Sequence, residues 1–400
     1  MLPSMGGLSV AAAGAPAPAH RQSRLRELVA SAPRPTAATV PRCRVRVAAT
    51  DTGVGTILTG LAQLAREGRI ELAMDVCPEA PPLTDGPWHL RDKAGGLVEL
   101  FVDERRSALI DVHDSWEIDA HALATHDLYF KRSLRPLSPR LPHAQRIRAL
   151  GLVDDVRADG FDRYEAQRIL LAHAPRAART RAFVRFLGST LLAAAGRGNR
   201  PVLARMHSPP RFDQAPRALF MTALWDPGLV PAWSPQKRAE FEAINQTRVA
   251  VLRALRRAFG PRFHGGLRHS DYTRRHYPEL LLPRTAAGSP REFIRRVHEH
   301  PVCVTTTGLH GSTGWKLAEY LALSRAIACE PLLYEVPGEL AAGRHYLEFR
   351  DPDACVAAVG RLLQDADERH AMMERNWQYW QQWLRPDRLA WRIVEETRSA

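Results

Sequence analysis

The sequence alternates between short apolar runs of the β-strand type and longer stretches in which apolar residues recur at helical spacing. The clearest example begins with a strand-type run at 44–49 and a loop at 50–55. A helical pattern follows and stops at Glu67-Gly68, before a second strand-type run at 71–76. Because strand–helix–strand units build parallel sheets covered by helices, the chain is predicted to be an α/β protein. Further strands are expected at 97–102, 108–112 and 128–130.

The same alternation returns in the second half of the chain. Strand-type runs are found at 218–222, 262–266, 302–306 and 326–329. Helical patterns are found at 234–259, 290–298, 314–323 and 351–364. Two α/β halves are therefore predicted, joined by a segment around 162–195 whose pattern is helical.

These patterns divide the chain into five parts. We expect a flexible Ala/Pro/Gly-rich leader at 1–40, a first α/β domain at 41–160, a helical connector at 161–199, a second α/β domain at 200–375 and a C-terminal helix at 376–400. The last part carries a stripe of aromatic residues that is more typical of packing than of base stacking. Its members are Trp377, Tyr379, Trp380, Trp383 and Trp391.

The formal net charge of +13 first suggests an anionic partner such as a nucleic acid. However, only four of the 56 basic residues are lysine, and alanine and proline are abundant. This imbalance indicates a compositional bias, since a nucleic-acid surface normally recruits lysine as well. No nucleic-acid partner is predicted.

Cysteine and histidine spacing gives no sign of a metal site. The five cysteines are widely spaced without a CxxC pair, and His298, His300 and His310 lack an acidic or cysteine partner at metal spacing. No apolar run approaches the ~20 residues that cross a bilayer, and no early basic residues precede an apolar run. A cytoplasmic protein is expected, and the sequence leaves contact with a membrane surface and the oligomeric state open.

The most informative stretch is the small, polar loop between the strand at 302–306 and the helix at 314–323. A loop of this kind leaves backbone N–H groups at the positive end of a helix dipole, which suits a phosphate or diphosphate. Its candidate donors are Thr307, Gly308, His310, Gly311 and Ser312. Lys316 falls in the first helical turn, where a cation fits best beside an anion, and Glu319 could accept hydrogen bonds from ribose hydroxyls. The alternative is a surface Lys–Glu pair.

Loops of the first half are candidates for the other substrate. After the first strand, Asp51, Gly53 and Gly55 would allow a ligand to approach the backbone closely, or would simply form a tight turn. After the strand at 108–112, His113 or Asp114 could act as a general base, or could belong to a loop that caps the next helix.

Two basic groups have no assignment from the sequence alone. The strand that closes with Tyr129-Phe130-Lys131-Arg132 carries two adjacent cations that would face a ligand or solvent. The densest basic group could neutralise a leaving diphosphate or form a solvated loop. It consists of Arg268, His269, Asp271, Arg274 and Arg275.

The runs at 308–322 and 326–331, with the loop at 334–349 and the helix after it, resemble the donor-binding segment of GT-B glycosyltransferases of the group 1 type. The resemblance covers about 100 residues near the C-terminal end. It implies two Rossmann-like domains facing across a cleft, with a C-terminal helix that crosses back. It also implies a nucleotide-diphosphate sugar as co-substrate in the second domain, with Glu319 on the ribose and Lys316 near the diphosphate, and no resident cofactor.

One position departs from the family's pattern. Many members place a first glutamate eight residues before the second, where this chain has Gly311, so the sugar contact would fall to His310 or Ser312. The chain is predicted to be a metal-independent, hexosyltransferase-type enzyme that moves a sugar to a glycan, lipid, protein or small molecule. The alternative is a non-catalytic glycan- or nucleotide-binding protein with a transferase-like fold.

Overall fold

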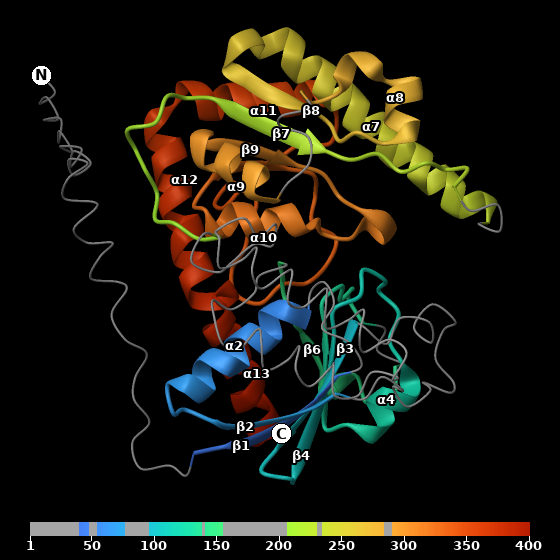
Figure 1. Ribbon diagram of the computed structural model, residues 1–400, viewed down its shortest axis with the longest axis vertical. Helices are drawn as coiled ribbons and strands as arrows, with labels where there is room; N and C mark the ends of the chain where they lie inside the picture. Colours follow the sequence, from blue (N-terminus) through green and yellow to red (C-terminus); the bar gives the residue numbers. More distant parts are fainter. Residues whose placement is uncertain are drawn as a thin grey trace, which may run out of the picture. The chain divides into compact units, whose positions relative to one another are not determined.

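The computed structural model describes residues 40–47, 54–76, 96–137, 141–154, 206–229, 234–283 and 290–400. The expected leader, the helical connector and most of the loop at 50–55 lie outside these residues. The described residues form two β-sheets, each flanked by helices (Figure 1). The predicted α/β class with two Rossmann-like halves is confirmed.

The first sheet contains six strands in the order β2-β1-β3-β4-β5-β6. They are β1 (Arg42–Val47), β2 (Glu71–Val76), β3 (Leu97–Val102), β4 (Arg106–Asp111), β5 (Leu128–Lys131) and β6 (Ile147–Ala149). Helix α2 (Val54–Arg66) connects β1 to β2, which pair in parallel as the sequence predicts. The chain leaves this helix through Gly68, whose φ of +68° favours glycine.

Strand β3 departs from the expected parallel sheet, because it runs antiparallel to both β1 and β4. Only residues 103–105 separate β3 from β4. A parallel pair needs a crossover of a dozen residues or more, so these two strands can only form a hairpin. The first sheet is therefore mixed.

Alternate residues of β4 and β5 point to opposite faces of the first sheet. Ile110 and Phe130 pack in the core under α2, whereas Leu109 and Tyr129 pack against α4 (Ala120–Thr125) on the other face. Each face is thus covered by a helix. The polar residues Asp111 and Lys131 lie at the carboxyl ends of these two strands.

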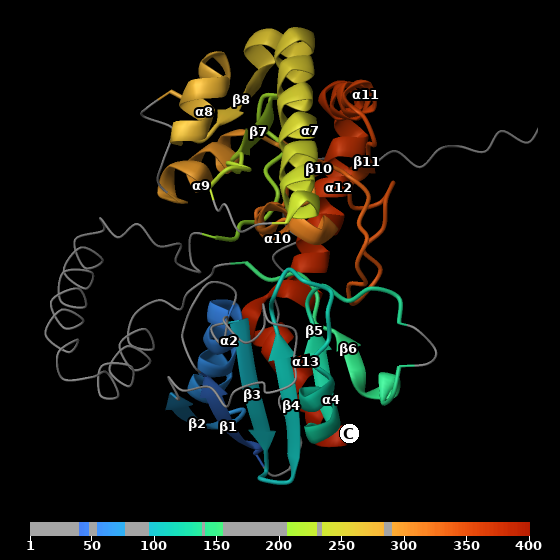
Figure 2. The same cartoon turned by 90° about the vertical axis from the view of Figure 1, so that its right-hand side faces the viewer.

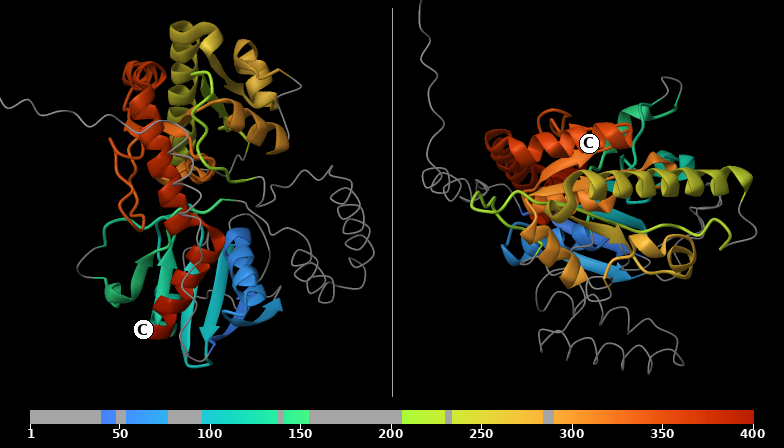
Figure 3. Two further views of the ribbon diagram at one scale, coloured as in Figure 1. Left: turned by 90° about the vertical axis from the view of Figure 1, so that its left-hand side faces the viewer. Right: turned by 90° about the horizontal axis from the view of Figure 1, so that it is seen from above.

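The last helix of the chain packs on the first sheet. Helix α12 (Ala366–Tyr379) continues through a π-helical turn at Trp380–Leu384 into α13 (Pro386–Ser399), which lies beside α2 (Figure 3). The two helices approach so closely that a Cβ on Gly60 would lie 1.9 Å from the Pro386 carbonyl oxygen. The expected C-terminal helix that crosses back is confirmed.

The second sheet contains five strands, all parallel, in the order β11-β10-β9-β7-β8. They are β7 (Ala218–Thr222), β8 (Phe263–Leu267), β9 (Val302–Thr305), β10 (Ala326–Cys329) and β11 (Leu347–Glu348). Helices α7 (Pro235–Phe259) and α11 (Pro352–Gln364) cover one face, and α8 (Asp271–His276) and α9 (Pro290–Glu299) lie on the other (Figure 2). Helix α10 (Trp315–Ala322) connects β9 to β10.

The order of these strands defines where a ligand would bind. From β7 the chain moves to β8 on one side, and it then returns to place β9 on the other side of β7. Ligands of open α/β sheets bind beyond the carboxyl ends of the strands at such a point of divergence. In this half, that point lies beyond the ends of β7 and β9. Within the part of the chain that the structure describes, no helix is long and apolar enough to cross a membrane.

Candidate functional site

A buried arginine of α7 joins the carboxyl ends of β7 and β9. The Arg248 Nε donates to the Thr306 hydroxyl at 3.0 Å, and its terminal nitrogens donate to the carbonyls of Ala223 at 2.8 Å and Thr307 at 3.1 Å. Burial lowers the pKa of Arg248 to about 10, and the charge of Glu330 opposes this effect. The guanidinium also lies 4.6 Å from the centroid of the Trp225 ring. Arg248 is therefore held at the point where the strand connections diverge.

Two further cations lie at the same place. Lys316, the second residue of α10, is partly buried, and its ammonium donates to the carbonyl of Met221 in β7. Arg268 follows β8, and its backbone N–H donates to the carbonyl of Thr222 at 2.8 Å. Burial and the charges of Arg248 and Arg268 lower the pKa of Lys316 to about 7, while Glu319 opposes the shift. These three cations, called the basic cluster below, surround the end of β7.

The backbone of the polar loop is largely engaged within the protein, which differs from the open cradle that its composition predicts. The N–H of Thr307 donates to the Glu330 carboxylate at 2.7 Å, and the N–H of His310 donates to Glu240. The N–H groups of Gly308, Gly311 and Ser312 donate to carbonyls of the loop itself. The loop turns back on itself because His310 and Gly311 both have positive φ, 59° and 66°.

The donors that remain lie at the start of α10. Among the described residues, no acceptor faces the backbone N–H groups of residues 313–316. These groups are at the positive end of the helix dipole, next to the Lys316 ammonium. The backbone N–H groups open to an anion thus lie in the first turn of the helix, a few residues along the chain from the predicted loop.

The structure also explains the missing glutamate. Gly311 has φ +66°, and a Cβ at this position would come within 2.7 Å of the Leu333 Cδ1 atom. Any larger residue would strain the backbone and displace that side chain. A glutamate at position 311 would therefore require a strained backbone and a shift of the Leu333 side chain. Of the two expected substitutes, Ser312 is buried and His310 is exposed.

On the first sheet, Asp111 at the end of β4 holds His113 by two hydrogen bonds. The buried Asp111 carboxylate accepts from the His113 backbone N–H at 2.9 Å and pairs with the His113 Nδ1 at 2.8 Å. It also accepts from the Tyr129 hydroxyl and the Lys131 ammonium, each at 2.7 Å. Although burial raises it, the charge of Lys131 and the bonds from His113 bring the pKa of Asp111 well below its usual range.

This arrangement fixes the tautomer of His113. An ionised Asp111 takes the proton-bearing Nδ1, so in the neutral ring the Nε2 atom carries the lone pair. The ring is packed so closely that a Cβ on Gly96 would come within 2.4 Å of Nε2. The carboxylate at Nδ1 orients the ring as in known histidine general bases, while Nε2 packs against Gly96.

Asp114 has a different environment. Its carboxylate pairs with Arg132, whose guanidinium also donates to the carbonyl of Thr313 at 2.8 Å and lies 4.9 Å from the centroid of the Trp315 ring. A further bond joins the Glu335 N–H to the Leu134 carbonyl at 2.8 Å. The segment after β5 thus contacts the start of α10, and it links the loop of His113 to the helix of Lys316.

The other residues predicted from the sequence do not all lie near the basic cluster. Asp51 and Gly53 lie outside the described residues, and Gly55 is partly buried in the first turn of α2. Of the basic group after β8, only Arg268 reaches Lys316; His269 bonds the Leu282 carbonyl, and Asp271 pairs with Arg274 on the surface. The sequence did not single out Arg248, Asp111 or Glu330 as functional residues. For Asp111 a signal existed, namely its place at the end of a strand.

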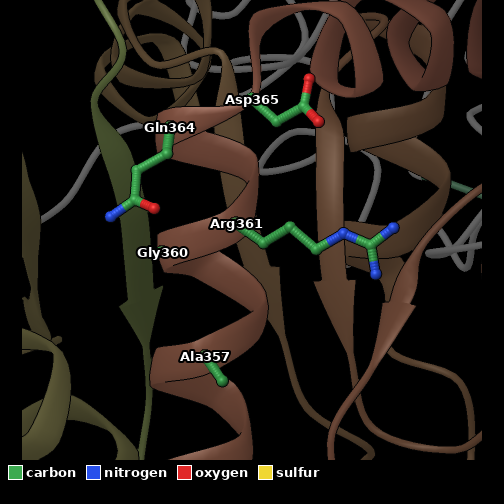
Figure 4. Close-up of a pocket in the computed structure, with 5 residues that line it drawn as sticks. All are labelled: Ala357, Gly360, Arg361, Gln364 and Asp365. Atoms are coloured by element: carbon green, nitrogen blue, oxygen red, sulfur yellow. The ribbon is translucent and has the colours of Figure 1, made fainter.

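Other features do not add to this site. Within the described ranges, no three His, Cys, Asp or Glu side chains come together to hold a metal ion. An open depression of about 390 Å³ runs along α11 and contains none of the predicted site residues (Figure 4). It is lined by Ala357, Gly360, Arg361, Gln364 and Asp365.

No family model and no curated protein matches this sequence. Among solved structures, it is similar to a putative UDP-N-acetylglucosamine 2-epimerase from Listeria monocytogenes, at 10% identity over 87% of this chain and 93% of that chain, with a TM-score of 0.41. An α1,3-fucosyltransferase is 12% identical over 87% and 85% of the two chains, with a TM-score of 0.38. The C-terminal domain of a group 1 glycosyltransferase from Francisella tularensis is 8% identical over 45% of this chain and 95% of that chain, with a TM-score of 0.32. Similarity at these low values carries no functional inference for this chain.

Proposed function

We propose that this protein is a glycosyltransferase that binds a nucleotide-diphosphate sugar beyond the carboxyl ends of β7 and β9. The observation that carries the proposal is the basic cluster, in which Arg248, Arg268 and Lys316 meet beside the free N–H groups of α10. The contacts of Arg132 join this cluster to the loop of His113, which would serve the acceptor.

The negative charge of a bound diphosphate would offset the like positive charges of the basic cluster. Burial, and then repulsion from the charges of Arg248 and Arg268, lowers the pKa of Lys316. An anion between them and the first turn of α10 would pair with the ammonium and accept from the helix N–H groups. The same groups would then stabilise the negative charge that develops on the departing diphosphate. Glu319, on the same helix, is proposed to bind the ribose hydroxyls.

His113 is the proposed general base. The acceptor oxygen would form its bond to the anomeric carbon as the bond to the diphosphate breaks, while the acceptor proton passes to the His113 Nε2 atom. Asp111 would stabilise the resulting imidazolium, since its carboxylate is ionised and bonded to Nδ1. A base separate from the leaving group is what an inverting transfer requires, so we propose inversion at the anomeric carbon. Asp114 is assigned to the ion pair with Arg132.

The test is a panel of UDP-, GDP- and ADP-sugars, with donor consumption and donor binding measured on the same protein. We expect one donor to be consumed, Lys316→Ala and Glu319→Ala to weaken its binding in calorimetry, and His113→Ala to bind it without turnover. Arg262→Gln removes an exposed charge at the opposite end of β8 and serves as the control.

Unchanged binding in both the Lys316 and Glu319 variants would refute the assignment of the donor site. Binding without turnover for every donor would instead favour the non-catalytic alternative.

A further inference from the structure

A large aromatic side chain is exposed close to the proposed base. Trp116 is 45% exposed and lies three residues after His113. Three residues span at most about 11 Å of backbone, so the indole is within reach of a molecule whose hydroxyl contacts the histidine. An exposed tryptophan at the edge of a polar site provides a flat apolar face for a ligand.

Arg135 lies over this ring and over a second one. Its guanidinium carbon is 5.0 Å from the Trp116 ring centroid and 5.5 Å from that of Tyr334. Stacking occupies the flat faces of a guanidinium and leaves the N–H groups at its edge. One of these groups makes a long bond of 3.4 Å to the carbonyl of His310.

Arg135 differs from most arginines that stack on aromatic rings in the described part of the chain. Five of the others form an ion pair with a carboxylate, as Arg44 does with Glu104 and Arg132 does with Asp114. The remaining three such pairs are Arg69–Glu67, Arg253–Glu279 and Arg392–Glu396. Arg248 and Arg135 have no such partner among the described residues. An anion could therefore pair with Arg135, as the diphosphate is proposed to do with Arg248.

We propose that Trp116 and Arg135 form an acceptor subsite for an anionic carbohydrate. A sugar ring presents an apolar face of C–H groups, which would pack on the indole of Trp116. A carboxylate or phosphate on that sugar would accept from the edge of the Arg135 guanidinium in bidentate geometry. This inference rests on the proposed function and names the acceptor class for the same site.

The size of the exposed surface favours a small ligand over a protein partner. Trp116 and Leu333, which is 52% exposed, are the large apolar side chains exposed among the described residues beside the site. A stable protein interface covers about 800 Å² on each partner, far more than these two side chains offer. One sugar ring, in contrast, needs only one aromatic face.

The experiment compares three probes that share a ring and differ in charge. Glucose, glucuronic acid and glucose 6-phosphate are titrated into the full chain, with binding followed by saturation-transfer NMR. The nucleoside diphosphate that binds in calorimetry is present at saturation, so that the basic cluster is occupied. We expect glucuronic acid or glucose 6-phosphate to bind about 10-fold more tightly than glucose, and the stronger of the two to identify carboxylate or phosphate as the preferred group.

Variants then assign the effect to the subsite. Arg135→Gln is expected to remove the preference for the charged probe, and Trp116→Ala to weaken all three. Arg105→Gln, which removes an exposed arginine in the turn between β3 and β4, is the matched control and should behave as the wild type.

Equal binding of glucose and the charged probes, or an unchanged preference in Arg135→Gln, would overturn the inference. If the sugar probes show no preference but the wild type binds a nucleoside diphosphate, the proposed function still stands. If the wild type binds no nucleoside diphosphate, the proposed function itself is refuted.

Discussion

Binding of a nucleoside diphosphate beside Lys316 should weaken as the pH rises above about 7. In the free protein, burial and the charges of Arg248 and Arg268 lower the pKa of Lys316 to about 7, so roughly half of the ammonium is ionised at that pH. Diphosphate oxygens favour the charged form and raise its pKa in the complex. Binding therefore takes up a proton, and affinity is lost as the pH rises from the lower pKa toward the higher one.

The size of the effect follows from the two pKa values. Each pH unit between them changes the binding free energy by up to about 1.4 kcal/mol, or 10-fold in Kd. If the bound lysine returns to its ordinary value of 10.5, the Kd should rise roughly 50-fold between about pH 7 and about pH 9. The diphosphate does not contribute to this change, because the last phosphate pKa lies near 6.

Calorimetry in buffers of different ionisation heat measures both the affinity and the proton uptake. The wild type should take up about half a proton at pH 7. Lys316→Arg keeps its charge across this range, so its affinity should not depend on pH, while Arg262→Gln should retain the slope of the wild type. A wild-type Kd that does not change between about pH 7 and pH 9, or the same slope in Lys316→Arg, would refute the reasoning.

Three more predictions concern the base and the stability of the fold. His113→Gln should lower kcat at least about 100-fold while the donor Kd stays within about twofold, as steady-state kinetics and calorimetry would show; an equal loss of binding contradicts a role as base. Gly60→Ala should reduce the free energy of unfolding by about 1–3 kcal/mol in denaturant titrations, because its Cβ would clash with the Pro386 carbonyl. Burial lowers the pKa of His264 and His345 to about 4, below the value of 6.5 for the unfolded chain, so Tm should fall as the pH drops from about 6.5 to 4, and less steeply in the double glutamine variant.

The sequence predicted most elements of the second sheet to within one or two residues. Runs such as 218–222 and 326–329 are buried throughout and almost entirely apolar because helices cover both faces of a parallel sheet. Strands β6 and β11 were missed, since three and two residues are too short to show a period. The antiparallel direction of β3 was missed. The short turn between β3 and β4 indicates it, but hydrophobic periodicity does not report strand direction.

The candidate site could be predicted where its residues lie in the loop or the first helical turn after a strand. Lys316 and His113 are candidates of this kind. Arg248 lies in the middle of the 25-residue helix α7, where no local pattern separates it from the other arginines. Glu240 and Glu330, which occupy the N–H groups of the polar loop, approach it only through the tertiary fold. These long-range partners decide which donors stay free for a ligand.

A crystal structure with the nucleoside diphosphate that binds in calorimetry tests the central claim most directly. We expect the diphosphate at the first turn of α10, with its oxygens against the N–H groups of residues 313–316 and the Lys316 ammonium, and with Arg248 and Arg268 beside it. A diphosphate bound elsewhere, for example in the depression along α11, with the start of α10 unoccupied, would contradict it.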